Sequence, residues 1–177
     1  MQIGIAGVGG IGSNVACILV RSGLPFLKII DFDLVDEGNL NRQFYFVDQV
    51  GRQKVMALSE NLRRISGQVE ILAMHERLHD GNINQLFADC DLIVEGFDRQ
   101  EEKKMLLESL GTSKKIVSAC GIAGAELKHI TVRRLGNCHI VGDFQTDCAD
   151  APLFAHKVMV IAAQMSALVL EQWRNVR

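Results

Sequence analysis

Two basic side chains and one acidic side chain carry the chemistry that this sequence could perform. Arg42 lies in the segment 39–43, which reads Asn-Leu-Asn-Arg-Gln, and Lys54 follows it twelve residues later. Asp98 comes just after a predicted strand at 91–95. An arginine and a lysine that converge can neutralise the α-phosphate oxygens and the leaving pyrophosphate of a nucleotidyl transfer. A strand-end carboxylate can hold Mg²⁺ against a triphosphate. Each charge alone would be an ordinary surface group, so the prediction rests on the set.

A glycine-rich turn near the N-terminus predicts a phosphate-binding site. The sequence Gly-Val-Gly-Gly-Ile-Gly spans residues 7–12, after the apolar run 3–6 and before a helical pattern. Unpaired N–H groups at a helix start point at an anion, and glycine lets a phosphate approach closely. Asp31 lies 19 residues after Gly12, where a carboxylate can accept hydrogen bonds from ribose hydroxyls. These features fit a dinucleotide as well as ATP. Tight strand–helix packing and a turn carboxylate would explain them without a nucleotide.

The elements that must position these residues alternate between strand and helix through the first two-thirds of the chain. Short apolar runs predict strands at 3–6, 27–31, 69–74, 91–95 and 115–120. Apolar residues at helical spacing predict helices that begin at 11 and at 51, a short helix at 83–87 and a helix at 99–110. The polar segment 31–43 between them is expected to be a functional loop. This alternation predicts an α/β fold with a Rossmann-like, doubly wound, mainly parallel sheet.

The last third of the chain follows a different pattern. Residues 126–134 and 138–141 leave no room for a helix between them, and Gly136-Asn137 suits a turn. We therefore expect an antiparallel β-hairpin added to the sheet. After a loop at 142–154, the apolar run 154–173 predicts a closing C-terminal helix. That helix is either part of the core or buried between two subunits.

Composition narrows the class of protein. A single domain across residues 1–177 is long enough to bury a core, and a net charge of −2 argues against nucleic-acid binding. Five cysteines without a C-x-x-C pair predict reduced thiols in the cytoplasm, with neither disulfides nor structural zinc. No signal peptide and no stretch long enough to span a membrane are recognised.

These motifs together resemble a known superfamily. The glycine turn 7–12, the Asp31-Phe-Asp33 segment, Asn39-Leu-Asn-Arg-Gln43, the Gly51-x-x-Lys54 spacing and Asp98 are similar to those of ubiquitin-activating-enzyme-like proteins. Within that superfamily the whole chain resembles the short bacterial adenylyltransferases that act on the sulfur-carrier protein of thiamine biosynthesis (ThiF type). The longer relatives carry two C-x-x-C pairs for zinc and a helical segment before the first strand, and neither is found in this sequence.

The resemblance implies a reaction, its cofactors and its partners. The Gly-Gly carboxylate of a ubiquitin-like sulfur-carrier protein attacks the α-phosphate of Mg·ATP, giving an acyl-adenylate and pyrophosphate. A sulfur-donor protein and a homodimer are further expectations. Arg42 and Lys54 would stabilise the phosphates and Asp98 would bind Mg²⁺. The residues expected to bind the nucleotide are Gly7, Gly9, Gly10, Gly12, Asp31, Asp33, Gly38, Asn39, Asn41, Arg42, Lys54 and Asp98.

Cys148 is a further candidate for a catalytic role. It precedes the closing helix, near the position of the reactive cysteine in some relatives, where it would take part in sulfur transfer. The neighbouring Asp147 and Asp150 are expected to raise its pKa and make it less reactive.

Residues 75–79 match the zinc-protease pattern H-E-x-x-H. That chemistry needs both histidines on one face of a helix. The stretch instead continues a predicted strand and runs into Asp80-Gly81, so we expect no zinc there.

Two alternatives to an adenylyltransferase remain open. An NAD-dependent oxidoreductase would use the same glycine turn and Asp31, but it would give Arg42 and Lys54 no task. A non-catalytic nucleotide-binding subunit would have no reason to keep Arg42, Lys54 and Asp98 together.

Overall fold

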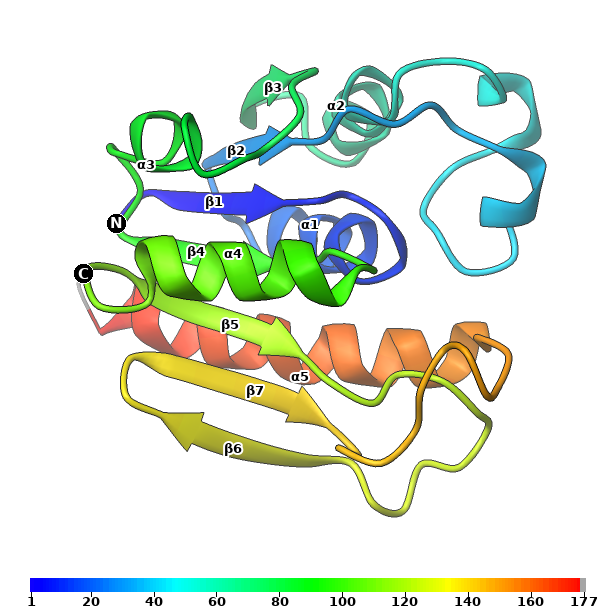
Figure 1. The fold of residues 1–177 in the computed structure, drawn as a ribbon. Coiled ribbons are helices and arrows are strands. Elements are labelled where there is room, and N and C mark those ends of the chain that lie inside the picture. The colour runs from blue at the N-terminus through cyan, green and yellow to red at the C-terminus, as the bar shows by residue number, and fades with distance from the viewer. Residues whose placement is uncertain (176–177) are drawn as a thin grey trace.

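A seven-stranded sheet organises the computed structural model, which describes residues 1–175 (Figure 1). The strands lie in the order β3-β2-β1-β4-β5-β7-β6. They are β1 (Ile3–Ala6), β2 (Phe26–Ile30), β3 (Glu70–Met74), β4 (Leu92–Glu95), β5 (Lys115–Ala119), β6 (Thr131–Leu135) and β7 (Cys138–Gly142). Neighbouring strands pair in parallel except β6 and β7, which form the predicted antiparallel hairpin.

Helices cover both faces of this sheet, because alternate residues of a strand point to opposite sides. One face carries Ile3 and Ile5 and packs against α1 (Gly10–Arg21), α2 (Lys54–Ile65) and α5 (Ala155–Arg174). The other face carries Ala6 and packs against α3 (Ile83–Leu86) and α4 (Gln100–Leu110). The predicted doubly wound α/β fold with a closing C-terminal helix is therefore confirmed.

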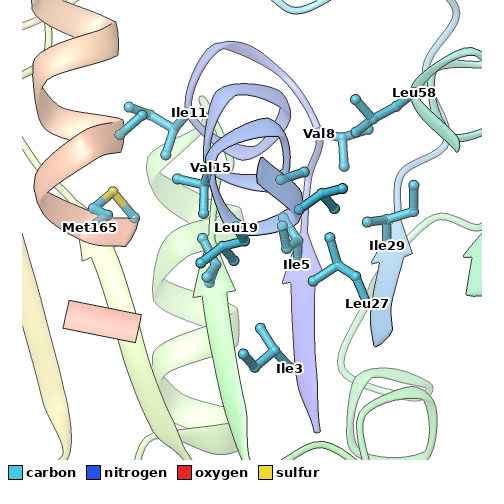
Figure 2. Packing of buried hydrophobic residues seen from close by; sticks show 14 of the residues in the cluster. Ile3, Ile5, Val8, Ile11, Val15, Leu19, Leu27, Ile29, Leu58 and Met165 are labelled. Carbon is cyan, nitrogen blue, oxygen red and sulfur yellow. The ribbon is translucent and has the colours of Figure 1, made fainter. Parts of the chain in front are cut away.

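The helix that follows the glycine turn is held in the larger of the two cores. Val15 and Leu19 lie on one side of α1, facing Ile3 and Ile5, and Met165 of α5 packs beside them (Figure 2). All five side chains are fully buried. Each such side chain contributes about 1.5–3 kcal/mol on leaving water. This packing fixes the N-terminal end of α1 relative to the sheet edge.

The hairpin begins later than the sequence predicts. We expected its first strand at residue 126, whereas β6 begins at Thr131. Gly124 instead pairs with the segment before α5, since its N–H donates to the carbonyl oxygen of Pro152 at 2.8 Å. Residues 127–130 form a turn, in which the N–H of Ile130 donates to the carbonyl oxygen of Leu127 at 3.2 Å.

The predicted loop after β2 is longer than expected and ends at Lys54. It contains two short 3₁₀ turns, η1 (Glu37–Asn39) and η2 (Val47–Gln49). The helix predicted from residue 51 starts at Lys54, because Gly51 has a φ of +84° and bends the chain back. The N–H of Gly51 donates to the carbonyl oxygen of Val35, and that of Lys54 to the carbonyl oxygen of Asp33. This pairing brings Lys54 next to the end of β2.

Among the helices that the structure describes, none is both long and apolar enough to cross a membrane.

Candidate nucleotide-binding site

A hollow opens at the edge of the sheet where β1, β2 and β4 end. The strand order changes direction beside β1, which is where open α/β sheets bind ligands. The hollow is open to solvent, and the space between its walls out to the mouth is about 920 Å³. The residues of the predicted nucleotide site that line it are Gly7, Gly9, Gly10, Asp31, Asp33, Arg42, Lys54 and Asp98.

The glycines of the turn 7–12 divide into two pairs. A Cβ on Gly12 would lie 2.0 Å from the carbonyl oxygen of Gly7, and Gly7 itself has a φ of +82°. These two glycines let α1 pack tightly on the end of β1, and Gly12 is buried outside the hollow. By contrast, a Cβ on Gly9 or Gly10 would meet nothing closer than 3.4 Å. Gly9 and Gly10 therefore present accessible backbone to the hollow.

The start of α1 is arranged to receive an anion. Gly9 precedes the helix, and its carbonyl oxygen accepts the N–H of Ser13 at 3.0 Å. No side chain among residues 1–175 caps the first turn. Gly10 and Ile11 of that turn line the hollow. The free N–H groups and the positive end of the helix dipole thus lie at one wall.

Asp31 directly follows β2, and its side chain holds the glycine turn against the end of that strand. Its carboxylate accepts the N–H of Val8 and the N–H of Asp33, both at 2.7 Å. Burial raises the pKa of Asp31, while the backbone hydrogen bond from Asp33 and the charge of Lys54 partly oppose the rise. Tyr45 donates its hydroxyl hydrogen to the carbonyl oxygen of Val8 at 2.7 Å, behind the same turn.

Lys54 reaches the hollow as an ion pair with Asp33. Their Nζ and Oδ2 atoms lie 2.8 Å apart, and the lysine is buried while the aspartate is half-exposed. Asp33 therefore has a structural partner that the sequence did not indicate. A buried ammonium group without a counter-charge is costly, and Asp33 supplies that counter-charge at the wall of the hollow.

Arg42 is held by its own loop. Its Nη1 donates to the carbonyl oxygen of Gly38 at 2.9 Å and to Oδ1 of Asn41 at 2.7 Å. Asn39 serves in the η1 turn, where its Oδ1 accepts the N–H of Asp36 at 3.2 Å. Gly38, Asn39 and Asn41, which we predicted as nucleotide ligands, do not line the hollow. In the structure they shape the loop and orient the arginine.

Asp98 lines the hollow from the turn between β4 and α4. It is exposed, and Glu102 in the first turn of α4 also lines the hollow. Burial raises the pKa of Glu102, and the charge of Asp98 raises it further. Within residues 1–175, no group of three or more His, Cys, Asp or Glu side chains is placed to hold a metal ion.

A family model described as the ThiF family matches residues 1–167. This chain belongs to the ThiF family. The resemblance inferred from the glycine turn, Asp31, the segment 39–43, Lys54 and Asp98 is thereby confirmed.

Several curated proteins are similar to this ThiF-family chain. The probable adenylyltransferase/sulfurtransferase MoeZ of Mycobacterium tuberculosis is 35% identical over 95 residues, 53% of this chain and 24% of the relative. Ubiquitin-like modifier-activating enzyme 5 of Drosophila melanogaster is 39% identical over 97 residues, 55% of this chain and 21% of the relative. The adenylyltransferase and sulfurtransferase UBA4 of Candida glabrata is 28% identical over 138 residues, 76% of this chain and 32% of the relative. The chain thus spans between a fifth and a third of the length of these relatives.

Solved structures share the fold. The Escherichia coli tRNA N6-threonylcarbamoyladenosine dehydratase TcdA, in complex with AMP, superposes with a TM-score of 0.88 at 18% identity, covering 99% of this chain and 88% of that one. MccB of Escherichia coli, with AMPCPP and MccA, gives a TM-score of 0.73 at 21% identity, covering 96% and 55%. At such identities the likeness concerns the fold.

Cys148 of the ThiF-family chain is exposed but does not line the hollow. Burial raises the pKa of its thiol, and the neighbouring charge of Asp147 raises it further, while Lys103 and Arg42 act in the opposite direction. The thiol is therefore mostly protonated at neutral pH, and a catalytic role for it stays a prediction.

The stretch 75–79 is irregular, so the helix that the zinc-protease pattern requires is not formed. Glu76 lines the hollow, and the guanidinium of Arg77 stacks on the Phe32 ring with its carbon 4.4 Å from the ring centre. This stretch therefore borders the hollow.

Sequence reasoning missed a buried carboxylate that supports the Asp98 turn. Glu95 is fully buried at the end of β4 and accepts the N–H of Phe97 at 2.7 Å. Lys103 donates to both of its carboxylate oxygens, and the Ser118 hydroxyl donates to Oε2 at 2.5 Å. The sequence did contain a signal for this buried carboxylate, since Glu95 directly follows the apolar run 92–94.

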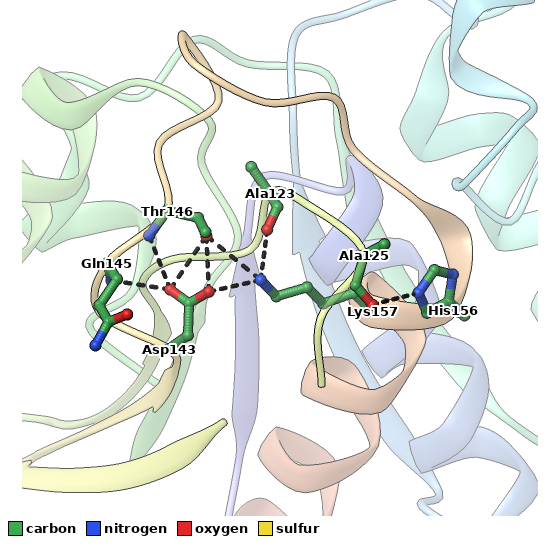
Figure 3. Close-up of polar contacts among 7 residues, drawn as sticks. All are labelled: Ala123, Ala125, Asp143, Gln145, Thr146, His156 and Lys157. Carbon is green, nitrogen blue, oxygen red and sulfur yellow. Dashed lines mark hydrogen bonds and ion pairs between the residues drawn. The ribbon is translucent and has the colours of Figure 1, made fainter. Parts of the chain in front are cut away.

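A second buried ion pair was also missed. Lys157 of α5 is fully buried, donates to Oδ2 of Asp143 at 2.6 Å, and donates to the carbonyl oxygen of Ala123 (Figure 3). Burial alone would raise the pKa of Asp143, but the hydrogen bonds from Lys157, Thr146 and Gln145 hold it well below its ordinary value. Ile122 precedes Ala123, Leu153 lies just before α5, and both line the hollow. The ion pair therefore connects two segments that contribute to the wall of the hollow.

Proposed function

We propose that this chain is an ATP-dependent adenylyltransferase that acts on the C-terminal Gly-Gly carboxylate of a ubiquitin-like sulfur-carrier protein. The observation that carries the proposal is the convergence of Arg42 and Lys54 on a hollow that also contains the start of α1 and Asp31. A helix N-terminus with Arg42 and Lys54 at one opening suits a triphosphate better than a nicotinamide dinucleotide.

The chemistry follows from this arrangement. A carboxylate oxygen of the carrier attacks the α-phosphorus of ATP, a new P–O bond forms, and the bond to the β-phosphate breaks. The products are a carrier acyl-adenylate and pyrophosphate. The chain supplies no nucleophile, so its contribution is positioning and charge stabilisation. Asp31 would hold the ribose, the N–H groups of α1 the phosphates, and Arg42 and Lys54 the charge that develops on them.

The hollow offers an exposed carboxylate that could bind a magnesium ion. Mg²⁺ usually binds one or two protein carboxylates, several waters and the phosphates of its substrate. Asp98 offers an exposed carboxylate at the hollow, which matches that donor set. When bound, the ion would neutralise charge on the phosphates, and Asp98 would hold it in place.

The remaining parts of the proposal concern context. We propose thiamine biosynthesis as the pathway, a sulfur-donor protein as a further partner, and a homodimer of one-domain chains. The five free thiols suit a reducing cytoplasm. An apolar stripe on the outer side of α5, formed by Met159, Ala163 and Ala167, supports a subunit contact there.

One assay tests the proposed function. The protein is mixed with Mg·ATP and a panel of carriers ending in Gly-Gly, and exchange of labelled pyrophosphate into ATP is measured together with the mass of the carrier. We expect exchange that depends on the carrier and on its terminal carboxylate. NADH binding without ATP binding would favour an oxidoreductase. ATP binding without exchange for every carrier would favour a non-catalytic subunit.

A further inference from the structure

The carboxamide of Gln43 makes no hydrogen bond with the described residues. It lines the hollow beside the start of α1, with Nε2 3.7 Å from the point where a Cβ on Gly9 would lie. Its Oε1 atom is buried, and within residues 1–175 it has no hydrogen-bond partner. Buried carbonyl oxygens in native proteins are nearly always paired, so this one calls for an explanation.

The backbone around Gln43 is firmly anchored, in contrast to its side chain. Asn14 of α1 donates to the carbonyl oxygen of Arg42 at 2.8 Å. The hydroxyl of Ser13, also on α1, accepts the N–H of Phe44 at 3.0 Å. These contacts on either side fix the Gln43 main chain against α1. The main chain that carries the carboxamide is thus rigidly supported at the wall of the hollow, as is usual for ligand-binding groups.

The position of Gln43 indicates what its carboxamide could bind. Next to Gly9 it lies at the phosphate end of the proposed ATP site, where the ligand offers oxygen acceptors. A phosphate could use the Nε2 donor but leaves Oε1 without a donor. The ribose hydroxyls already have an acceptor in Asp31. The second substrate ends in peptide groups, whose N–H groups are donors that suit Oε1.

We propose that Gln43 binds the main chain of the terminal Gly-Gly segment of the carrier. This inference rests on the proposed function and extends it to recognition of the protein substrate. A primary carboxamide matches a peptide group, since its N–H can donate to the peptide carbonyl while its oxygen accepts the peptide N–H. The last torsion of a glutamine side chain is soft, so the group can turn into the hollow when the peptide arrives. Gln43 then aligns the attacking carboxylate with the α-phosphate.

A chemical double-mutant cycle tests this contact. Gln43→Met keeps the length of the side chain and removes both hydrogen-bonding atoms. The matching change in the substrate is a carrier whose last peptide nitrogen is N-methylated, prepared by peptide ligation. Gln68→Met is the control, because Gln68 is exposed and lies outside the hollow. KM for each carrier is measured by pyrophosphate exchange, and affinity for a non-hydrolysable ATP analogue is measured without carrier.

We expect Gln43→Met to raise KM for the normal carrier about tenfold or more, as the loss of two hydrogen bonds predicts. Affinity for the ATP analogue should change by less than about twofold, since this contact is with the carrier. N-methylation should raise KM of the wild-type protein about fivefold or more and leave that of Gln43→Met nearly unchanged, because the shared hydrogen bond is already absent.

Three results would overturn the inference while leaving the proposed function intact. They are an unchanged KM in Gln43→Met, an equal effect of N-methylation on both proteins, and a loss confined to the ATP analogue. If the wild-type protein exchanges pyrophosphate with no Gly-Gly carrier at all, the proposed function fails and this inference fails with it.

Discussion

At the scale of single residues, Arg42 and Lys54 are both held by partners within the chain. Lys54 pairs with Asp33, and Arg42 donates to Gly38 and Asn41. Such partners fix where each positive charge lies before a ligand arrives, so little reorganisation is needed when phosphate binds. The half-exposed Asp33 also limits how strongly Lys54 is neutralised, because water screens that carboxylate.

Replacing Lys54 tests its proposed role. We expect Lys54→Met to lower kcat for pyrophosphate exchange by about 10²–10³-fold, the usual loss when one group that stabilises transition-state charge is removed. Thermal stability should change little, because the partner Asp33 can be solvated. The control is Lys115→Met, an exposed lysine on β5 away from the hollow. A loss in kcat of less than about threefold would contradict the role.

At the scale of elements, the turn between β1 and α1 combines a packing function with a binding function. Gly7 and Gly12 bring the strand and the helix together, while Gly9 and Gly10 leave the backbone open to the hollow. The two functions fall on different glycines, so they can be separated by mutation.

Alanine substitutions at two of these glycines should behave differently. Gly12→Ala places a methyl group 2.0 Å from the carbonyl oxygen of Gly7, and we expect it to destabilise the fold by about 3 kcal/mol or more. Gly10→Ala meets nothing closer than Val158 Cγ1 at 3.4 Å and lies in a helix, so stability should hold or rise slightly. The same methyl group should weaken ATP binding, because it lies where phosphate would approach the backbone. Urea unfolding and ATP-analogue titration measure both, and equal destabilisation by the two variants would contradict this division.

The pair Asp143–Lys157 ties α5 to the two segments that close the hollow. Three segments far apart in the sequence meet at Lys157 Nζ, as Figure 3 shows. Removing one partner of such a buried pair leaves the other charge unpaired, which costs about 3–5 kcal/mol.

The stabilisation by Asp143 should depend on pH in a defined direction. Its pKa in the folded chain lies well below the unfolded value of about 3.9, so its contribution is fully present at neutral pH. The contribution is lost as the pH falls below about 5 towards the folded-state pKa. We expect the difference in unfolding free energy between wild type and Asp143→Asn to shrink between pH 7 and pH 3. The double variant Asp143→Asn/Lys157→Met should recover much of the lost stability. A difference that stays constant with pH would contradict the assignment.

At the scale of the whole molecule, α5 has two sides with different surroundings. Its inner side packs on α1 through Val158, Ile161 and Met165. Its outer side exposes the apolar stripe of Met159, Ala163 and Ala167, which recurs at intervals of four residues. The two alternatives left open by the sequence are thus compatible, since a core helix can also face a second subunit.

A charge in the middle of the stripe tests the proposed homodimer. We expect Ala163→Glu to halve the mass measured by size-exclusion chromatography with light scattering, because a buried unpaired carboxylate is costly at an interface. Melting temperature at low protein concentration should stay close to that of the wild type. Leu135→Glu, on the exposed strand β6, should leave the mass unchanged. A mass that is the same for all three proteins would contradict a dimer through α5.

The sequence by itself determined the order of elements and the location of the candidate nucleotide site. Strand and helix periodicities are local, and the glycine turn at 7–12 needs only its neighbours to be recognised. The positions of Asp31 and Asp98 followed because parallel strands end at one edge of the sheet. The charges of Arg42 and Lys54 indicated nucleotidyl transfer, and the resemblance added the expected protein substrate.

Only the tertiary structure decided which side chains meet. Lys54 with Asp33, Glu95 with Ser118, and Lys157 with Asp143 each join segments that no local pattern relates. The order of β7 and β6 in the sheet was also decided by the tertiary structure. β7 is the more buried strand and pairs with β5, while all five residues of β6 are exposed at the edge. Local periodicity predicts which side of a helix or strand is apolar. The partner of a buried charge is decided only by folding, because segments distant in the sequence must pack together before the two side chains are removed from water.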